Sequence, residues 1–130
     1  MNLNHEQIIL PSKNQLHNWV VVGGGGPRDI LVRAVGPTLG VFGLGNAMAD
    51  PRLELYNGAE RVLANDNWTA NLAPTFTSVG AFTLPPGSLD AAFLQAVDGA
   101  RSIWAQGGGP GVVLVEAYDT GSTNSPRLVN

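Results

Sequence analysis

The chain has 130 residues, of which 44% are apolar and 13% are charged, with no cysteine and a net charge of −3. A domain of this length can bury enough apolar surface to fold without disulfides, and the lack of cysteine excludes thiolate metal sites and cysteine nucleophiles. The seven Lys and Arg residues are scattered, so they do not form the basic face that nucleic-acid binding requires.

The first strand signals lie on either side of four consecutive glycines. Trp19–Val22 and Ile30–Val35 are rich in β-branched residues, and Gly23–Gly26 lies between them. A phosphate-binding loop would lead from a strand into a helix, whereas a second strand follows these glycines. We therefore predict a glycine-rich hairpin and no nucleotide site. Ile8–Leu10 is a candidate for a short strand before it.

Residues 36–51 carry glycine and proline at a density that prevents a regular element, which predicts a long crossing loop. We expect its apolar residues to pack against a sheet edge. They are Leu39, Val41, Phe42, Leu44 and Met48.

A hairpin is predicted next. Arg52–Tyr56 alternates with a period of two, which places Leu53 and Leu55 inward. Asn57-Gly58 is typical of a two-residue hairpin turn, and Arg61–Ala64 is the returning strand.

The remaining strand signals follow at short intervals. One helical turn is possible within residues 71–79. Strands are expected at Ala81–Leu84 and Asp90–Val97, and a last hairpin from Ser102–Gln106 and Val112–Tyr118. Short strands separated by turn signals predict an all-β fold, namely a jelly-roll-like β-sandwich of about eight short strands with glycine-rich turns.

Four stretches together resemble a known module: residues 30–39 (ILVRAVGPTL), 49–56 (ADPRLELY), 64–68 (ANDNW) and 112–119 (VVLVEAYD). They are similar to the repeated β-rich module of large exported proteins in Verrucomicrobia-type bacteria, where it stands in tandem or beside immunoglobulin-like domains. The pattern LELYNG…ANDNW is also similar to bacterial pre-peptidase C-terminal domains, which are jelly-roll-like sandwiches. The resemblance implies a divergent N-terminal segment at 1–18 and a single sandwich module at 19–130.

The resemblance also implies a role. Such modules have no established catalytic activity, so we expect a structural or adhesive module of an extracellular or cell-surface protein. Residues 126–130 look like the opening of a following copy, and a missing opening strand would leave an unpaired sheet edge. The expected partners are therefore neighbouring modules or a second copy. Residues 1–13 do not have the pattern of a signal peptide, and no stretch is long enough to insert into a membrane as a helix.

A calcium site is the most specific ligand hypothesis. Asn65, Asp66 and Asn67 place three oxygen-bearing side chains in one turn, and Ca²⁺ prefers six to eight oxygen ligands. Asp90 is the expected further ligand, with Asp50 and Asp119 as alternatives. The competing interpretation is an Asx-type turn in which these side chains bond their own backbone.

A carbohydrate site is the second hypothesis. Trp19, Trp68 and Trp104 could form a platform on which sugars stack, or they could fill the core. Trp68 follows a polar turn, so we expect it to be partly exposed and to be the binding residue.

Catalytic signals are few. No serine lies in a G-x-S-x-G motif, and both histidines, His5 and His17, lie near the N-terminus. A sandwich could bring Glu54 and Glu116 onto one face, although we expect each to be a solvated outward charge. The alternative function is a small calcium-dependent hydrolase of esters or lactones, in which calcium near Asp66 polarises a carbonyl.

Overall fold

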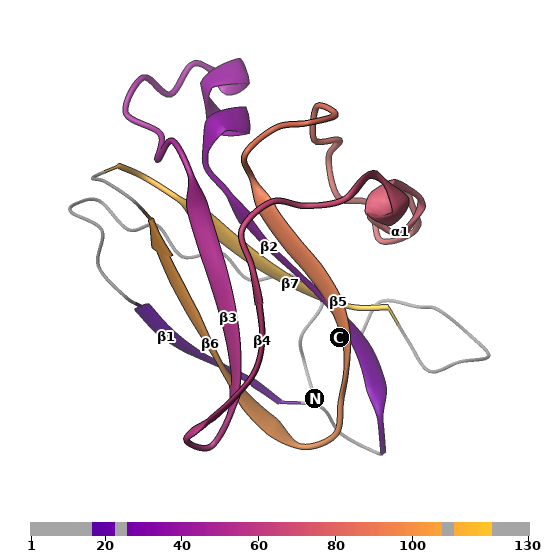
Figure 1. Ribbon diagram of the computed structural model, residues 1–130. Helices are drawn as coiled ribbons and strands as arrows, with labels where there is room; N and C mark the ends of the chain where they lie inside the picture. The colour runs from indigo at the N-terminus through magenta and orange to yellow at the C-terminus, as the bar shows by residue number, and fades with distance from the viewer. Residues whose placement is uncertain (1–16, 23–25, 108–110, 121–130) are drawn as a thin grey trace.

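The computed structural model describes residues 17–22, 26–107 and 111–120, and for residues 17–22 it describes the backbone only. These residues form seven strands and three short helical segments (Figure 1). The elements are β1 (His17–Val22), β2 (Arg28–Val35), the 3₁₀ helix η1 (Pro37–Phe42), β3 (Pro51–Asn57), β4 (Glu60–Asn65), the 3₁₀ helix η2 (Ala70–Leu72), α1 (Ala73–Ser78), β5 (Ala91–Val97), β6 (Ala100–Gly107) and β7 (Leu114–Asp119).

The strands form two antiparallel sheets that pack against each other. One sheet has four strands in the order β1-β6-β3-β4, and the other has three in the order β5-β2-β7. This arrangement confirms the predicted all-β sandwich, with seven strands in the described part of the chain against the expected eight or so. Figure 1 shows the two layers, with the β3–β4 turn at one end of the sandwich and η1 at the opposite end.

The main core lies between the sheets and follows the two-residue period of the strands. Ile30, Val32 and Ala34 of β2 face inward, and Leu53 and Leu55 of β3 face them from the other sheet. The other members of this cluster are Met48, Ala91, Phe93, Val97, Ile103, Ala105, Val113, Val115 and Ala117, with Leu63 packed against its margin.

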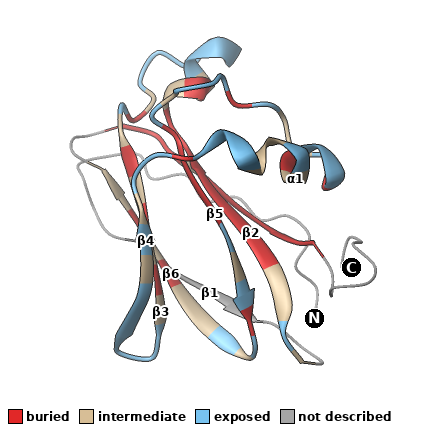
Figure 2. Cartoon of the chain, turned by 45° about the vertical axis from the view of Figure 1, so that its right-hand side comes forward, coloured by how far each residue is buried: buried red, intermediate tan, exposed pale blue. Residues whose placement is uncertain are grey.

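A second apolar cluster covers the outer face of the three-stranded sheet. Leu31 and Val35 point away from the first core and pack with Phe76 of α1 and with Leu84. Both faces of β2 are therefore buried from Ile30 to Val35, and Figure 2 shows this strand in red except at its tan N-terminal end. The helical turn expected within residues 71–79 is present as α1, and it forms part of this cover.

The predicted β3–β4 hairpin is confirmed. Leu55 pairs with Leu63, and Asn57 pairs with Glu60 across the turn, with a bulge between Leu55 and Tyr56. The two turn residues are Gly58 and Ala59 and not Asn57 and Gly58, because Asn57 is the last residue of β3. Gly58 has a φ of +63°, a positive value that the first residue of a tight hairpin turn can take and that favours glycine.

The other two predicted hairpins are wrong, because their strands lie in different sheets. β1 pairs with β6, whereas β2 pairs with β5 and β7. The glycine-rich segment after β1 therefore connects the two sheets. Likewise, β6 and β7 lie in opposite sheets. A glycine-rich connection allows the chain to turn but does not select the partner strand.

Two loop predictions are also corrected. Residues 81–84 form no strand, because they lie beside Pro85 and Pro86 and contribute Leu84 to the second cluster instead. In the crossing loop Met48 is buried and Leu39 is partly buried, as expected, but three apolar side chains, Val41, Phe42 and Leu44, are exposed. The possible strand at 8–10 lies outside the described residues.

Candidate functional site

The outer face of the four-stranded sheet carries a row of polar and aromatic side chains along β3 and β6. Residues that alternate with the buried leucines of β3 point outward, and each lies opposite an outward residue of β6. The three cross-strand pairs are Arg52 with Gln106, Glu54 with Trp104, and Tyr56 with Ser102. We call these six residues the β3/β6 face, and all six are partly exposed.

Glu54 is the centre of the hydrogen-bond network on this face. The Tyr56 hydroxyl donates to its Oε1 at 2.8 Å, and Arg52 Nε lies 3.3 Å and Arg61 Nη1 3.4 Å from its Oε2. Burial alone would raise the pKa of Glu54, but the Tyr56 hydrogen bond and the two arginines outweigh it, so the pKa is lowered. Glu54 is therefore a carboxylate that its neighbours hold in place and that accepts hydrogen bonds.

Trp104 and Tyr56 form an aromatic pair beside Glu54. Their ring centroids lie 6.2 Å apart with an interplanar angle of 66°, which is an edge-to-face arrangement. A hollow of about 250 Å³ is lined by both rings, by Glu54, and by Gly58 and Ala59 of the β3–β4 turn. The hollow thus combines two aromatic surfaces with one carboxylate.

A second hollow, of about 310 Å³, lies at the other end of the same strands. Asp50, Arg52, Asp66, Gln106 and Gly107 line it. Burial raises the pKa of Asp50, and so do the charge of Asp66 and a hydrogen bond between the two carboxyl groups. The Oδ1 atom of Asp50 is buried and has no hydrogen-bond partner. The fold therefore brings two of the acids considered for calcium together.

The other predicted calcium residues are placed differently. The Asn65 side chain accepts from Ala92 N at 3.0 Å and donates to Asn67 O at 3.2 Å. The bond from Ala92 N ties the end of β4 to β5, whereas the bond to Asn67 O is the local side-chain-to-backbone bond that the Asx-type alternative describes. Asn67 is exposed in the turn. Asp119 lies in the three-stranded sheet, where Arg28 Nε is 3.1 Å from its carboxylate.

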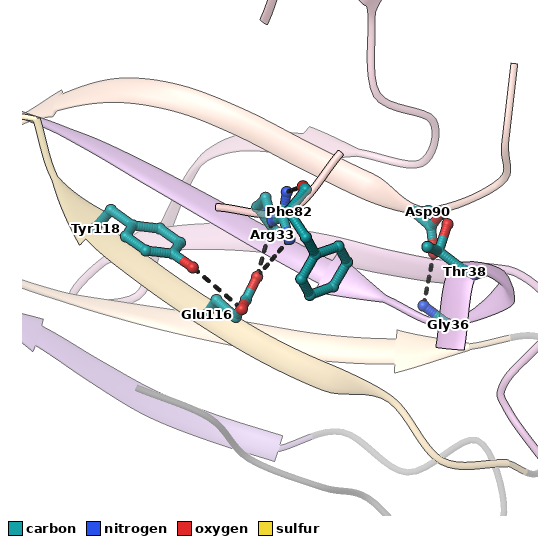
Figure 3. A network of polar contacts seen from close by, with 7 residues as sticks. All are labelled: Arg33, Gly36, Thr38, Phe82, Asp90, Glu116 and Tyr118. Carbon is teal, nitrogen blue, oxygen red and sulfur yellow. Dashed lines mark hydrogen bonds and ion pairs between the residues drawn. The ribbon is translucent and has the colours of Figure 1, made fainter. Parts of the chain in front are cut away.

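Asp90 is completely buried and holds two loops together. Its Oδ1 accepts from Gly36 N at 2.8 Å and from Thr38 N at 3.3 Å. Its Oδ2 accepts from the hydroxyls of Thr38 and Ser88. Both oxygens are already used by protein donors, so Asp90 acts as an anchor for the segment that enters η1 (Figure 3).

The expectation that Trp68 is partly exposed is wrong. Trp68 is 8% exposed, its ring packs on Phe76, and its Nε1 donates to Ser88 Oγ at 3.0 Å. The ring turns inward from the polar turn and becomes part of the second cluster. Trp104 is the tryptophan on the β3/β6 face, and its alternation with the buried Ile103 and Ala105 was the sequence signal for that position. The Trp19 side chain is outside the described residues.

Glu116 is buried, contrary to the expectation of a solvated charge. It points to the outer face of the three-stranded sheet, on the opposite side of the sandwich from Glu54, so the two acids do not share a face. Arg33 Nε and Nη2 each lie 2.8 Å from Glu116 Oε1, and Tyr118 donates to Oε2 at 3.1 Å (Figure 3). Burial raises the pKa of Tyr118, and the charge of Glu116 adds to this effect.

The Arg33 guanidinium is also covered by aromatic rings. Its Cζ lies 4.8 Å from the Phe76 centroid and 4.5 Å from the Phe82 centroid, and its Nη1 donates to Phe82 O at 2.7 Å. Cation–π contacts of this kind help offset the cost of burying the charge. The Arg33–Glu116 pair is therefore part of the structural core, and Arg33 fixes residues 81–84 against β2 through Phe82.

Within the described residues, no group of three or more His, Asp or Glu side chains gathers in a way that could hold a metal ion. No helix in that part of the chain is long and apolar enough to cross a membrane. Comparison of the chain with models of known families, with curated protein sequences and with solved structures gives no match.

Proposed function

We propose that the chain is a non-catalytic adhesive module of an exported or surface protein, and that it binds carbohydrate on the β3/β6 face. The observation that carries the proposal is the Trp104–Tyr56 pair beside the fixed carboxylate of Glu54. Aromatic rings present apolar surface to the faces of sugar rings, while carboxylates, guanidinium groups and amides bond sugar hydroxyls.

The geometry supports an extended ligand better than an enclosed one. Polar groups continue from Glu54 through Arg52 to Gln106, and a hollow lies at each end of this row. Both hollows are at or below the small end of the range for pockets that enclose a ligand. A chain of sugars that lies along the strands would contact both hollows.

The same geometry disfavours glycoside hydrolysis on this face. The reaction needs two carboxyl groups held about 5–9.5 Å apart. Tyr56 and two arginines hold Glu54 and lower its pKa, so Glu54 is a poor general acid for this reaction.

Affinity electrophoresis against neutral, acidic and sulfated polysaccharides tests the proposal. We expect at least one polysaccharide to retard the protein and to change its tryptophan fluorescence. Trp104→Ala and Tyr56→Ala should abolish retardation, whereas Leu94→Ala should not, because this exposed apolar residue lies on the other sheet. Retardation that survives Trp104→Ala would refute the assignment of this face, and release of sugar products would refute a non-catalytic role.

Calcium binding at Asp50 and Asp66 is a second candidate. Two neighbouring carboxyl groups with an unbonded buried oxygen favour a cation that would neutralise them. The donors present are oxygens, as Ca²⁺ requires, and the Gln106 amide also lines the hollow. Backbone and water oxygens would have to complete the shell.

A thermal melt with excess calcium and with chelator tests this site. Calcium that binds only the folded chain must raise its Tm. We expect Asp66→Asn to remove the calcium-dependent rise in Tm. Asn71→Ala, an exposed residue that does not line the hollow, should retain it. Hydrolysis of an ester or lactone that requires both calcium and Asp66 would support the alternative of a calcium-dependent hydrolase. An unchanged Tm would eliminate the calcium site.

A further inference from the structure

The end of the β3–β4 hairpin carries the one Asn-Gly pair in the sequence, Asn57-Gly58. Asn57 is the last residue of β3 and Gly58 is the first residue of the turn. Both are exposed, and Figure 2 shows this turn in the colour of exposed residues. A Cβ placed on Gly58 would have no heavy atom within 4 Å. The Asn57 side chain and the Gly58 nitrogen are therefore chain neighbours at a position that is open to solvent.

The geometry of the turn leaves the Gly58 N–H outside the ladder. In a two-residue hairpin turn the closing hydrogen bonds join the two flanking residues, which here are Asn57 and Glu60. Because glycine has no Cβ, no side chain shields its nitrogen, and its backbone can rotate freely. The Gly58 nitrogen can therefore be approached by the side chain that precedes it.

The end of this hairpin can open without unfolding the domain. β4 is an edge strand, and four of its six residues are exposed. The pairing of β3 with β4 is also irregular between Leu55 and Tyr56, close to the turn. Few buried contacts and exposed hydrogen bonds are characteristic of segments that open locally. Opening lets Asn57 leave its extended conformation, so that its side-chain carbon can reach the Gly58 nitrogen.

We propose that Asn57 is a site of spontaneous deamidation. The Gly58 nitrogen attacks Cγ of Asn57 and forms a C–N bond, the bond from Cγ to the side-chain nitrogen breaks, and that nitrogen leaves with the Gly58 proton as ammonia. Water then opens the resulting succinimide ring. Breakage of the bond from Cγ to the ring nitrogen gives aspartate, and breakage of the bond from the main-chain carbonyl carbon gives isoaspartate. The balance is one amide and one water converted to one carboxyl group and one ammonia, with no oxidant or reductant.

Both products should weaken the hairpin. They place a carboxylate opposite Glu60, the cross-strand partner of Asn57, and like charges opposite each other destabilise a strand pair. Isoaspartate also adds one methylene to the main chain between β3 and the turn. Gly58 and Ala59 line the hollow beside Trp104, so this change alters the hollow as well. A resulting loss of carbohydrate binding rests on the proposed function, whereas the modification itself does not.

Incubation of the purified chain in mildly alkaline buffer tests the proposal. Isoelectric focusing should show a more acidic form that accumulates with time. Peptide mapping by mass spectrometry should place aspartate and isoaspartate at position 57. Three other asparagines serve as internal controls and should stay unchanged over the same period, since each is exposed but is followed by a residue whose side chain hinders the attack: Asn46, Asn67 and Asn71.

Two variants test the chemistry at this pair. Asn57→Gln keeps the amide but requires a larger ring, so the acidic form should not accumulate. Gly58→Asn tolerates a positive φ and adds a side chain beside the attacking nitrogen, so it should slow the conversion of Asn57. Both positions are exposed, so both variants should fold, and circular dichroism checks this.

Four results would overturn the proposal. Absence of an acidic form after long incubation would show that the hairpin keeps the Asn57 side chain away from the Gly58 nitrogen. An acidic form that accumulates equally in Asn57→Gln would arise elsewhere in the chain. Equal conversion of the three control asparagines would remove any special role of this pair. An unchanged rate in Gly58→Asn would show that the glycine is not the reason for the reaction.

Discussion

Asp90 shows how one buried side chain can order a whole loop. Its carboxylate accepts from two backbone amides and two hydroxyls, so it acts on residues 36–38 and on Ser88 at the same time. The sequence alone suggested a calcium ligand, because an isolated Asp before a strand does not show which donors will surround it.

Replacement of Asp90 should therefore be costly. Asp90→Ala leaves several buried donors without an acceptor, and we expect the free energy of unfolding to fall by about 3 kcal/mol. Asp90→Asn keeps one acceptor oxygen and should cost less than half as much. Urea denaturation measures both values. Equal losses for the two variants would show that the hydrogen bonds are not the cause.

The Arg33–Glu116 pair should show non-additive behaviour. Glu116→Met leaves a buried guanidinium without this carboxylate, and Arg33→Met leaves a buried carboxylate without this guanidinium, so each should cost about 3–5 kcal/mol. The Arg33→Met/Glu116→Met double variant should lose much less than the sum of the single losses. Additive losses in this double-mutant cycle would contradict direct coupling.

Asp50 should make stability depend on pH. Its folded-state pKa is raised above 3.8 by burial and by Asp66, so the native state holds this proton more tightly than the unfolded chain does. This contribution to stability is full below 3.8 and is lost as the pH rises through the folded-state pKa. When a chelator is present, Asp50→Asn should therefore have a higher free energy of unfolding than the unaltered chain near neutral pH. This difference should disappear in acid. A gain that persists in acid would have another origin.

At the scale of elements, glycines determine how closely the loop before β3 approaches the sheets. A Cβ on Gly36 would lie 2.2 Å from Met48 O, whereas nothing lies within 4 Å of a Cβ on Gly40. We expect Gly36→Ala to destabilise the fold by about 2–3 kcal/mol through this backbone clash. Gly40→Ala, four residues later, should be neutral or slightly stabilising. Thermal melts of the two variants make the comparison, and a neutral Gly36→Ala would show that the loop can move aside.

The elements also show which features of the fold can be predicted from sequence patterns. The β3–β4 hairpin was predictable, because period-two alternation and the glycine after Asn57 are local signals for the strands and for a tight turn, although the turn residues are Gly58 and Ala59. β2, β5 and β6 were likewise found as strands. The strands with which they pair were not predicted, because pairing of β2 with β5 and β7 depends on contacts between residues far apart in the chain. The inward turn of Trp68 depends on α1 and Ser88 in the same way.

The candidate site was only partly visible in the sequence. Asp66 and Asp50 were both considered as calcium ligands, and the fold brings them together. The pairing of Trp104 with Glu54 was not foreseen, since it requires the register between β3 and β6. Glu116 was expected in solvent because its partner Arg33 lies 83 residues away, and no local pattern joins them.

At the scale of the whole molecule, the two sheets should differ in local stability. β2 is the central strand of its sheet and is buried on both faces, while β4 is an edge strand with mostly exposed side chains. Hydrogen exchange should therefore be slowest for the amides of β2 and much faster for those of β4. Similar protection in both strands would mean that the sandwich opens only as a single unit.

The order of strands also bears on how the protein is made. Every connection between consecutive strands passes from one sheet to the other, except the β3–β4 turn. β1 and β2 both find their partners among strands that begin at Ala91 or later. Of the strands in the described residues, β3 and β4 alone can pair early as the chain emerges from the ribosome, while β1 and β2 wait for β5, β6 and β7. Until then β1 and β2 are unpaired apolar segments, which chaperones that hold nascent chains would bind.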